Sequence, residues 1–107
     1  MAGLEDSNMI DVVALDRDGN CLVVMVETRT WSGGSEQREQ LKSKVNTYAA
    51  YILDGTLNRQ YPETIGQPVY IRLDCPEEPT DDIAAIVDWA ARQLRDWNIG
   101  FLVKIMK

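Results

Sequence analysis

The chain of 107 residues contains no histidine. This absence excludes the Ser-His-Asp and Cys-His arrangements that activate a nucleophile, and it excludes histidine-based zinc sites. The sequence also lacks the G-x-x-x-x-G-K-[ST] and G-x-G-x-x-G runs of common nucleotide-binding sites. Any catalysis must therefore depend on carboxylates, lysine, tyrosine or cysteine, and the sequence assigns no catalytic residue.

Long hydrophobic runs and cysteines are also scarce. No apolar stretch approaches the length of a membrane span, and Glu5 and Asp6 stand where a signal peptide needs basic and apolar residues. The two cysteines, Cys21 and Cys75, lie far apart without C-x-x-C spacing, so we expect free thiols in a reducing compartment. These features predict a cytoplasmic protein that does not use a membrane as a partner.

Basic residues are fewer than acidic ones. Seventeen acidic and eleven basic side chains give a net charge of −6, which opposes attraction to a phosphate backbone and disfavours nucleic acid as a partner. The apolar share of 45% and the charged share of 26% are typical of a globular protein. We expect residues 1–107 to form a single compact domain, with residues 1–8 as a loose N-terminal segment.

Hydrophobic periodicity divides the chain into strands and helices. Four short segments are rich in β-branched and apolar residues, and Asp18-Gly19 supplies turn chemistry between the first two. Two longer segments have apolar residues at helical spacing, and candidate N-caps are Ser35 for the first and Thr80 or Asp81 for the second. The predicted strands are 10–15, 21–28, 69–74 and 101–106; the predicted helices are 35–54 and 81–98, with room for one more helical turn before Pro62.

The order of these elements is β-β-α-β-α-β. Strand-helix-strand units favour parallel pairing with right-handed crossovers, so the last three strands are expected to be parallel and the first antiparallel to the second. The predicted fold is therefore α/β (α+β), a two-layer sandwich in which a mixed four-stranded sheet carries two helices on one face.

Side-chain parity in the opening hairpin decides which residues share a face. A three-residue turn, Arg17-Asp18-Gly19, with Gly19 in the left-handed region, pairs residues of equal parity across the two strands. The even-numbered positions are the cleaner apolar set and are expected to face the helices. They are Ile10, Val12, Ala14, Leu22, Val24 and Val26.

The odd-numbered side chains are then left on the outer face of the sheet. An apolar surface of this kind predicts self-association or docking on a protein partner. The alternative is a third layer formed by the N-terminal segment or a loop. The predicted interface residues are Val13, Leu15, Val23, Met25 and Tyr70.

Two acids of the hairpin, Asp11 and Glu27, are both at odd-numbered positions and so share a face in the predicted register. Their placement resembles the PD-(D/E)-x-K nuclease superfamily, with Arg29 where that motif has lysine. The resemblance implies a Mg²⁺ site formed by Asp11 and Glu27, and the metal is the only cofactor that any reading of the sequence suggests. Arginine fits the lysine role poorly, and too few residues precede Asp11 to supply the superfamily's leading helix and strand. The alternative is that the acids are solvated or pair with Arg29, Arg72 or Lys104.

A second candidate is the turn before the first helix. Gly33, Gly34 and Ser35 lie where free backbone amides and the helix dipole could hold an anion. The alternative is an ordinary strand-to-helix turn.

Three segments resemble a known group of proteins when taken together: VVMVETR.W at 23–31, YPE..G.PV.IRLDC at 61–75, and the capped second helix. They resemble a small bacterial family of uncharacterised proteins, a domain of unknown function, over nearly the whole chain. The resemblance implies a compact, stand-alone bacterial protein and implies no activity. The sequence therefore predicts a non-catalytic interaction module, as a homo-oligomer or with a protein partner. The alternative is a degenerate metal-dependent hydrolase that uses Asp11 and Glu27.

Overall fold

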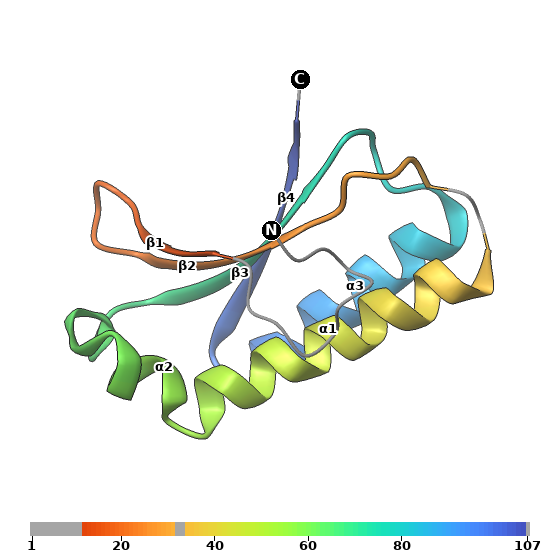
Figure 1. Cartoon of the computed structure of the whole chain (residues 1–107). Helices are drawn as coiled ribbons and strands as arrows, with labels where there is room; N and C mark the ends of the chain where they lie inside the picture. Colours follow the sequence, from red (N-terminus) through yellow and green to blue (C-terminus); the bar gives the residue numbers. More distant parts are fainter. Residues whose placement is uncertain (1–11, 32–33, 107) are drawn as a thin grey trace.

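The chain forms a four-stranded sheet with its helices on one face (Figure 1). The computed structural model describes residues 12–31 and 34–106. A short 3-10 helix, η1 (Pro62–Thr64), precedes the third strand. The strands are β1 (Val12–Leu15), β2 (Cys21–Val26), β3 (Val69–Cys75) and β4 (Ile99–Ile105); the helices are α1 (Ser35–Leu53), α2 (Thr56–Gln60) and α3 (Asp81–Arg95).

The strands follow one another across the sheet in the order β1-β2-β3-β4. β1 is antiparallel to β2, whereas β2, β3 and β4 are parallel. This arrangement confirms the predicted mixed sheet and its two layers, and α2 occupies the connection where one further helical turn was expected. None of the described helices is long and apolar enough to cross a bilayer.

The opening hairpin has the predicted register. Val12 pairs with Val24 and Leu15 with Cys21, so residues of equal parity lie opposite each other. Gly19 has a φ of 84° in the turn, a left-handed conformation that glycine adopts without steric cost. The Asp16 carboxylate accepts hydrogen bonds from the backbone N–H groups of Asp18 and Asn20, both at 2.9 Å, which fixes the turn.

The faces of the sheet are the reverse of the prediction, because the odd-numbered side chains contact the helices. The parallel register pairs Val23 with Ile71 and Met25 with Leu73, and all four side chains are completely buried. They pack against residues of α1 and α3. The core residues of α1 and α3 are Leu41, Val45, Tyr48, Ala49, Ile83, Ile86, Ala90 and Leu94, and α2 adds Leu57.

The predicted interface is therefore wrong at its centre. Val23 and Met25 lie in the core, and Val13 is half-buried against it. Tyr70 is half-buried on the opposite face, and only Leu15, at 45% exposure, is clearly at the surface. The prediction failed because β2 is apolar at its even-numbered and its odd-numbered positions. The sequence of this strand alone therefore does not show which face of the sheet lies against the helices.

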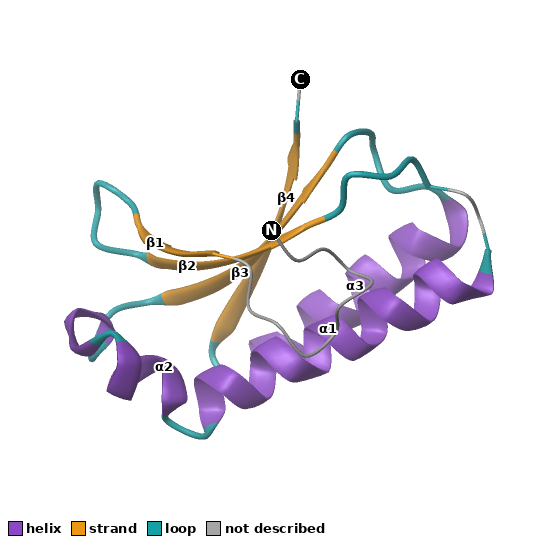
Figure 2. Ribbon diagram, in the orientation of Figure 1, coloured by secondary structure: helices purple, strands orange, loops and turns teal. Residues whose placement is uncertain are grey.

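The even-numbered face of β3 carries charge. Arg72 donates to Asp74 through two bonds, Nε to Oδ1 at 2.7 Å and Nη2 to Oδ2 at 3.0 Å. Among the described elements, no helix lies on this face of the sheet (Figure 2). A paired arginine and aspartate are tolerated there because part of their surface remains in water.

Gly100 on β4 is required by a close contact rather than by its backbone angles. It pairs with Tyr70 across the two strands, and the tyrosine ring lies over it. A Cβ atom at Gly100 would overlap Tyr70 Cδ2 and lie 2.5 Å from Cε2. Glycine thus lets the ring lie flat against the start of β4.

We expect Gly100→Ala to lower the free energy of unfolding by about 1–3 kcal/mol, because the new methyl group overpacks this contact. The same change in a Tyr70→Ala background should cost markedly less. Urea denaturation of the two single variants and the double variant measures the coupling. Equal costs of Gly100→Ala in both backgrounds would show that the ring is not the obstacle.

Candidate functional site

Glu27, the acid that the sequence singled out, follows β2 at the carboxyl end of the parallel strands and is completely buried. Its Oε1 accepts hydrogen bonds from Arg29 N and Nε, both at 2.9 Å. Its Oε2 accepts from Arg29 Nη2 at 2.9 Å and from Gln37 Nε2 at 3.0 Å. Each carboxylate oxygen therefore has two donors, which is the capacity of an ionised carboxylate.

These contacts favour the ionised form of Glu27. Burial raises the pKa of the carboxyl group, but the hydrogen bonds from Arg29 and Gln37 and the nearby positive charge outweigh it and hold the pKa below its ordinary value of 4.5. Arg29 is itself held, since its Nη2 also donates to Gln40 Oε1 at 2.7 Å. The group is a structural ion pair that ties the end of β2 to α1.

This arrangement bears on the metal hypothesis. Asp11 lies outside the described residues, so its distance from Glu27 is not defined. Across residues 12–31 and 34–106, no group of three or more potential metal-ligating side chains occurs. The pairing of Glu27 with Arg29 is the structural alternative that the sequence left open, and a metal ion at Glu27 would have to displace its present donors.

The loops at this end of the sheet are tied to each other. Trp31 donates from its backbone N to Glu77 Oε1 at 3.0 Å and from its indole Nε1 to the Glu77 carbonyl oxygen at 2.9 Å. The predicted anion site lies beside them: Gly34 is the N-cap residue of α1, Ser35 begins the helix, and Gly33 lies outside the described residues. Glu36 already places a negative charge in the first turn, and anion binding there stays a prediction.

Both thiols are buried rather than poised for reaction. Cys21 and Cys75 are free cysteines with no exposed surface. Burial raises the pKa of Cys21, and burial together with the acids around Cys75 raises the pKa of that thiol to about 11. At neutral pH both are protonated, and a thiol rather than a thiolate is a poor nucleophile.

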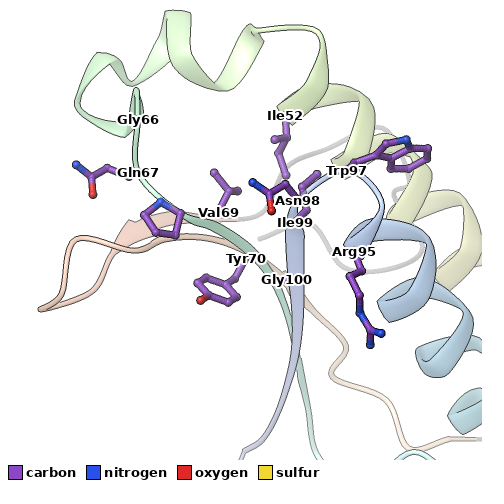
Figure 3. A pocket seen from close by; sticks show the side chains of 11 residues that line it. Ile52, Gly66, Gln67, Val69, Tyr70, Arg95, Trp97, Asn98, Ile99 and Gly100 are labelled. Carbon is purple, nitrogen blue, oxygen red and sulfur yellow. The ribbon is translucent and has the colours of Figure 1, made fainter.

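The opposite end of the sheet holds an open pocket, which we call the amino-end pocket (Figure 3). It has a volume of about 710 Å³ and lies where β3 and β4 begin. Its walls come from the end of α1, the loop before β3 and the turn from α3 to β4. The lining residues are Ile52, Gly66, Gln67, Pro68, Val69, Tyr70, Arg95, Trp97, Asn98, Ile99 and Gly100.

Sequence reasoning did not identify this pocket. Tyr70 was predicted as an interface residue, and Gly100 received no role. Arg95 and Gln67 received no role, because the segments that form the pocket lie far apart in the chain. The contact between Tyr70 and Gly100 can be predicted only when the register of β3 and β4 is known.

We expect Glu27→Gln to lower the free energy of unfolding at pH 7 by about 1–3 kcal/mol, because it puts a neutral amide at a buried position where all four hydrogen bonds are donated to a carboxylate, and it removes the counter-charge of Arg29. The pKa of Glu27 is lowered in the fold, so its contribution is complete above pH 4.5 and is lost as pH falls through the folded-state value. The difference between wild type and variant should therefore narrow in acid. Urea unfolding at several pH values tests this, with the exposed Glu39→Gln as the control.

Divalent metal provides a separate test of the Asp11 and Glu27 hypothesis. We expect Mg²⁺ and Mn²⁺ to leave the melting temperature unchanged, since the donors around Glu27 would have to be displaced before it could bind metal. A metal-dependent rise in Tm that Glu27→Gln abolishes would contradict this expectation and support the hydrolase alternative.

Comparison with known proteins gives a family but no activity. No curated protein and no solved structure matched the chain. Residues 2–107 match the family described as a family of unknown function (DUF6572). The match covers nearly the whole chain, in agreement with the resemblance seen in its sequence segments, and the chain therefore belongs to this family of unknown function.

Proposed function

We propose that this protein is a non-catalytic module that self-associates by pairing β4 with β4 of a second copy. The observation that carries the proposal is the exposed, apolar outer edge of the sheet. β4 has seven residues and one charge, Lys104, and its side chains Leu102 and Val103 are 43% and 38% exposed. A long apolar edge strand is a template for pairing with another strand.

The backbone groups of β4 point alternately toward β3 and away from the sheet. Met106 N–H, just beyond the strand, donates to the Cys75 carbonyl oxygen at 2.7 Å. The even-numbered residues of β4 therefore direct their backbone N–H and C=O groups toward β3. The odd-numbered residues then direct their N–H and C=O groups outward. These residues are Ile99, Phe101, Val103 and Ile105.

An antiparallel pair of β4 strands centred on Leu102 uses all of these outward groups. Ile99 then lies opposite Ile105 of the second copy, and Phe101 lies opposite Val103. Both are pairs whose backbone groups face each other, and Leu102 lies opposite its own counterpart. The two copies of Lys104 fall opposite Gly100 at separate ends of the pair, which avoids like-charge repulsion at the centre.

The other edge of the sheet is less suited to pairing. β1 has four described residues, and the turn that follows it carries Asp16, Arg17 and Asp18. Short edges with charged neighbours are a common way in which proteins discourage strand addition. We therefore assign association to β4 rather than β1.

The absence of catalysis is part of the same proposal. It is supported by the saturated hydrogen bonding of Glu27 and by the buried, protonated thiols Cys21 and Cys75. We also propose a cytoplasmic location, because two free thiols fit a reducing compartment.

Proline substitution on the two sheet edges tests the proposal. Val103→Pro removes an outward N–H without removing a donor to β3, and Leu15→Pro does the same on the edge of β1. We expect wild type to dimerise in sedimentation equilibrium and Val103→Pro to raise the dissociation constant at least about tenfold. Leu15→Pro should leave it unchanged.

Circular dichroism and thermal unfolding establish that both variants fold. A wild-type protein that stays monomeric at high concentration would overturn the proposal. Equal weakening by the two prolines would also overturn it, because association would then not depend on β4.

A further inference from the structure

We propose that the second copy also docks along α3, so that Asp88 of each copy forms an ion pair with Arg95 of the other. This inference rests on the β4 pairing proposed above and names the helix contact that accompanies it. Three observations carry it: an open groove beside β4, the distribution of charge along α3, and the position that the strand pair gives to each charge.

The groove lies between β4 and the first half of α3, and we call it the carboxyl-end groove. It has a volume of about 260 Å³. Val103 is on the helix-bearing face of β4 but is 38% exposed, so α3 leaves the outer edge of this face uncovered. The apolar residues that line the groove are Ala84, Val87, Val103 and Ile105.

The proposed strand pair supplies an apolar group to this groove. Phe101 of the second copy lies opposite Val103, and side chains that are opposite each other in a pair of strands point to the same face. The pair therefore places an aromatic ring beside Val103, at the open side of the groove. Burial of apolar surface between the two copies then continues from the strands toward the helices.

Asp88 and Arg95 lie on one side of α3, about two helical turns apart, with the small residue Ala91 between them. Both charged side chains are exposed, and neither makes a hydrogen bond or ion pair within the described chain. Figure 3 shows the Arg95 guanidinium directed away from Asn98, in the direction that β4 runs in this view. A small side chain between the two charges allows a second helix to come close.

The register of the strand pair determines which charges meet. Asp88 lines the carboxyl-end groove together with Ile105, whereas Arg95 lines the amino-end pocket together with Ile99. In the proposed pair, Ile105 lies opposite Ile99 of the second copy. Asp88 is thereby brought to the end of the interface where Arg95 of the second copy lies, and two-fold symmetry repeats the contact.

The charge of α3 as a whole suits this arrangement. Its first turn carries Asp81 and Asp82, and its last turn carries Arg92 and Arg95. The two-fold axis makes the two α3 helices antiparallel, so the acidic half of each lies beside the basic half of the other. A parallel arrangement would instead bring like charges together, which is unfavourable.

Charge reversal tests the ion pair, because the two reversed chains should complement each other. Asp88→Arg and Arg95→Glu should each raise the dissociation constant in sedimentation equilibrium about tenfold or more, since both contacts of the homodimer become repulsive. An equimolar mixture of the two variants should associate within about threefold of wild type, because its mixed dimer has two contacts between opposite charges.

Arg92→Glu is the matched control. It makes the same change of charge in the same turn of α3, but Arg92 is exposed and lines neither the groove nor the pocket. The dissociation constant should stay within about twofold of wild type, the change expected from general electrostatics. Equal weakening by Arg92→Glu would overturn the ion pair, as would a mixture that associates no more tightly than the separate variants. Circular dichroism establishes that every variant folds.

Val103→Pro separates this inference from the strand pairing. If the proline weakens association while the reversed chains dimerise like wild type, the β4 pair stands and the helix contact is overturned. If the reversed chains complement each other while Val103→Pro has no effect, the β4 pair is overturned and the ion pair stands without it. A monomeric wild type overturns both.

Discussion

The parallel pairing of β2 with β3 determines which side chains face the helices, and the rest of the structure depends on it. The register places Val23 beside Ile71 and Met25 beside Leu73, which creates one continuous apolar layer. α1 is fastened to this layer by Tyr48, whose hydroxyl donates to the Val24 carbonyl oxygen at 2.8 Å. β4 continues the same register, so its odd-numbered side chains Ile99, Phe101 and Ile105 extend the core layer of β2 and β3. The even-numbered side carries the charged pair of β3.

The two crossover connections run over the same face, so the strands follow chain order across the sheet. Open α/β sheets that bind ligands at the carboxyl ends of their strands do so where strand order reverses and the loops separate. This sheet has no such reversal. The loops after β2 and β3 meet instead, through Trp31 and Glu77, and the amino-end pocket lies at the opposite end of the strands.

The sequence predicted what is encoded locally. The hairpin turn with Gly19, the order of elements and the parallel arrangement all follow from turn chemistry, periodicity and chain connectivity. The predicted orientation of β2 was wrong. On β3 the even-numbered positions hold the charged residues Arg72 and Asp74, so aligning β2 with β3 shows that the odd-numbered face is the apolar one. The contact of Glu27 with Gln37 and the amino-end pocket could not be predicted, because they join segments whose spatial relation only the packed structure defines.

The positions of the cysteines have a consequence for following motion in this protein. Cys21 is the first residue of β2 and Cys75 is the last residue of β3, so one thiol lies at each end of the central strand pair. Neither has solvent-accessible surface in the folded chain. An alkylating reagent can therefore reach each sulfur only when that end of the sheet opens, and the labelling rates of the two thiols report separately on fraying near the pocket and near Glu27.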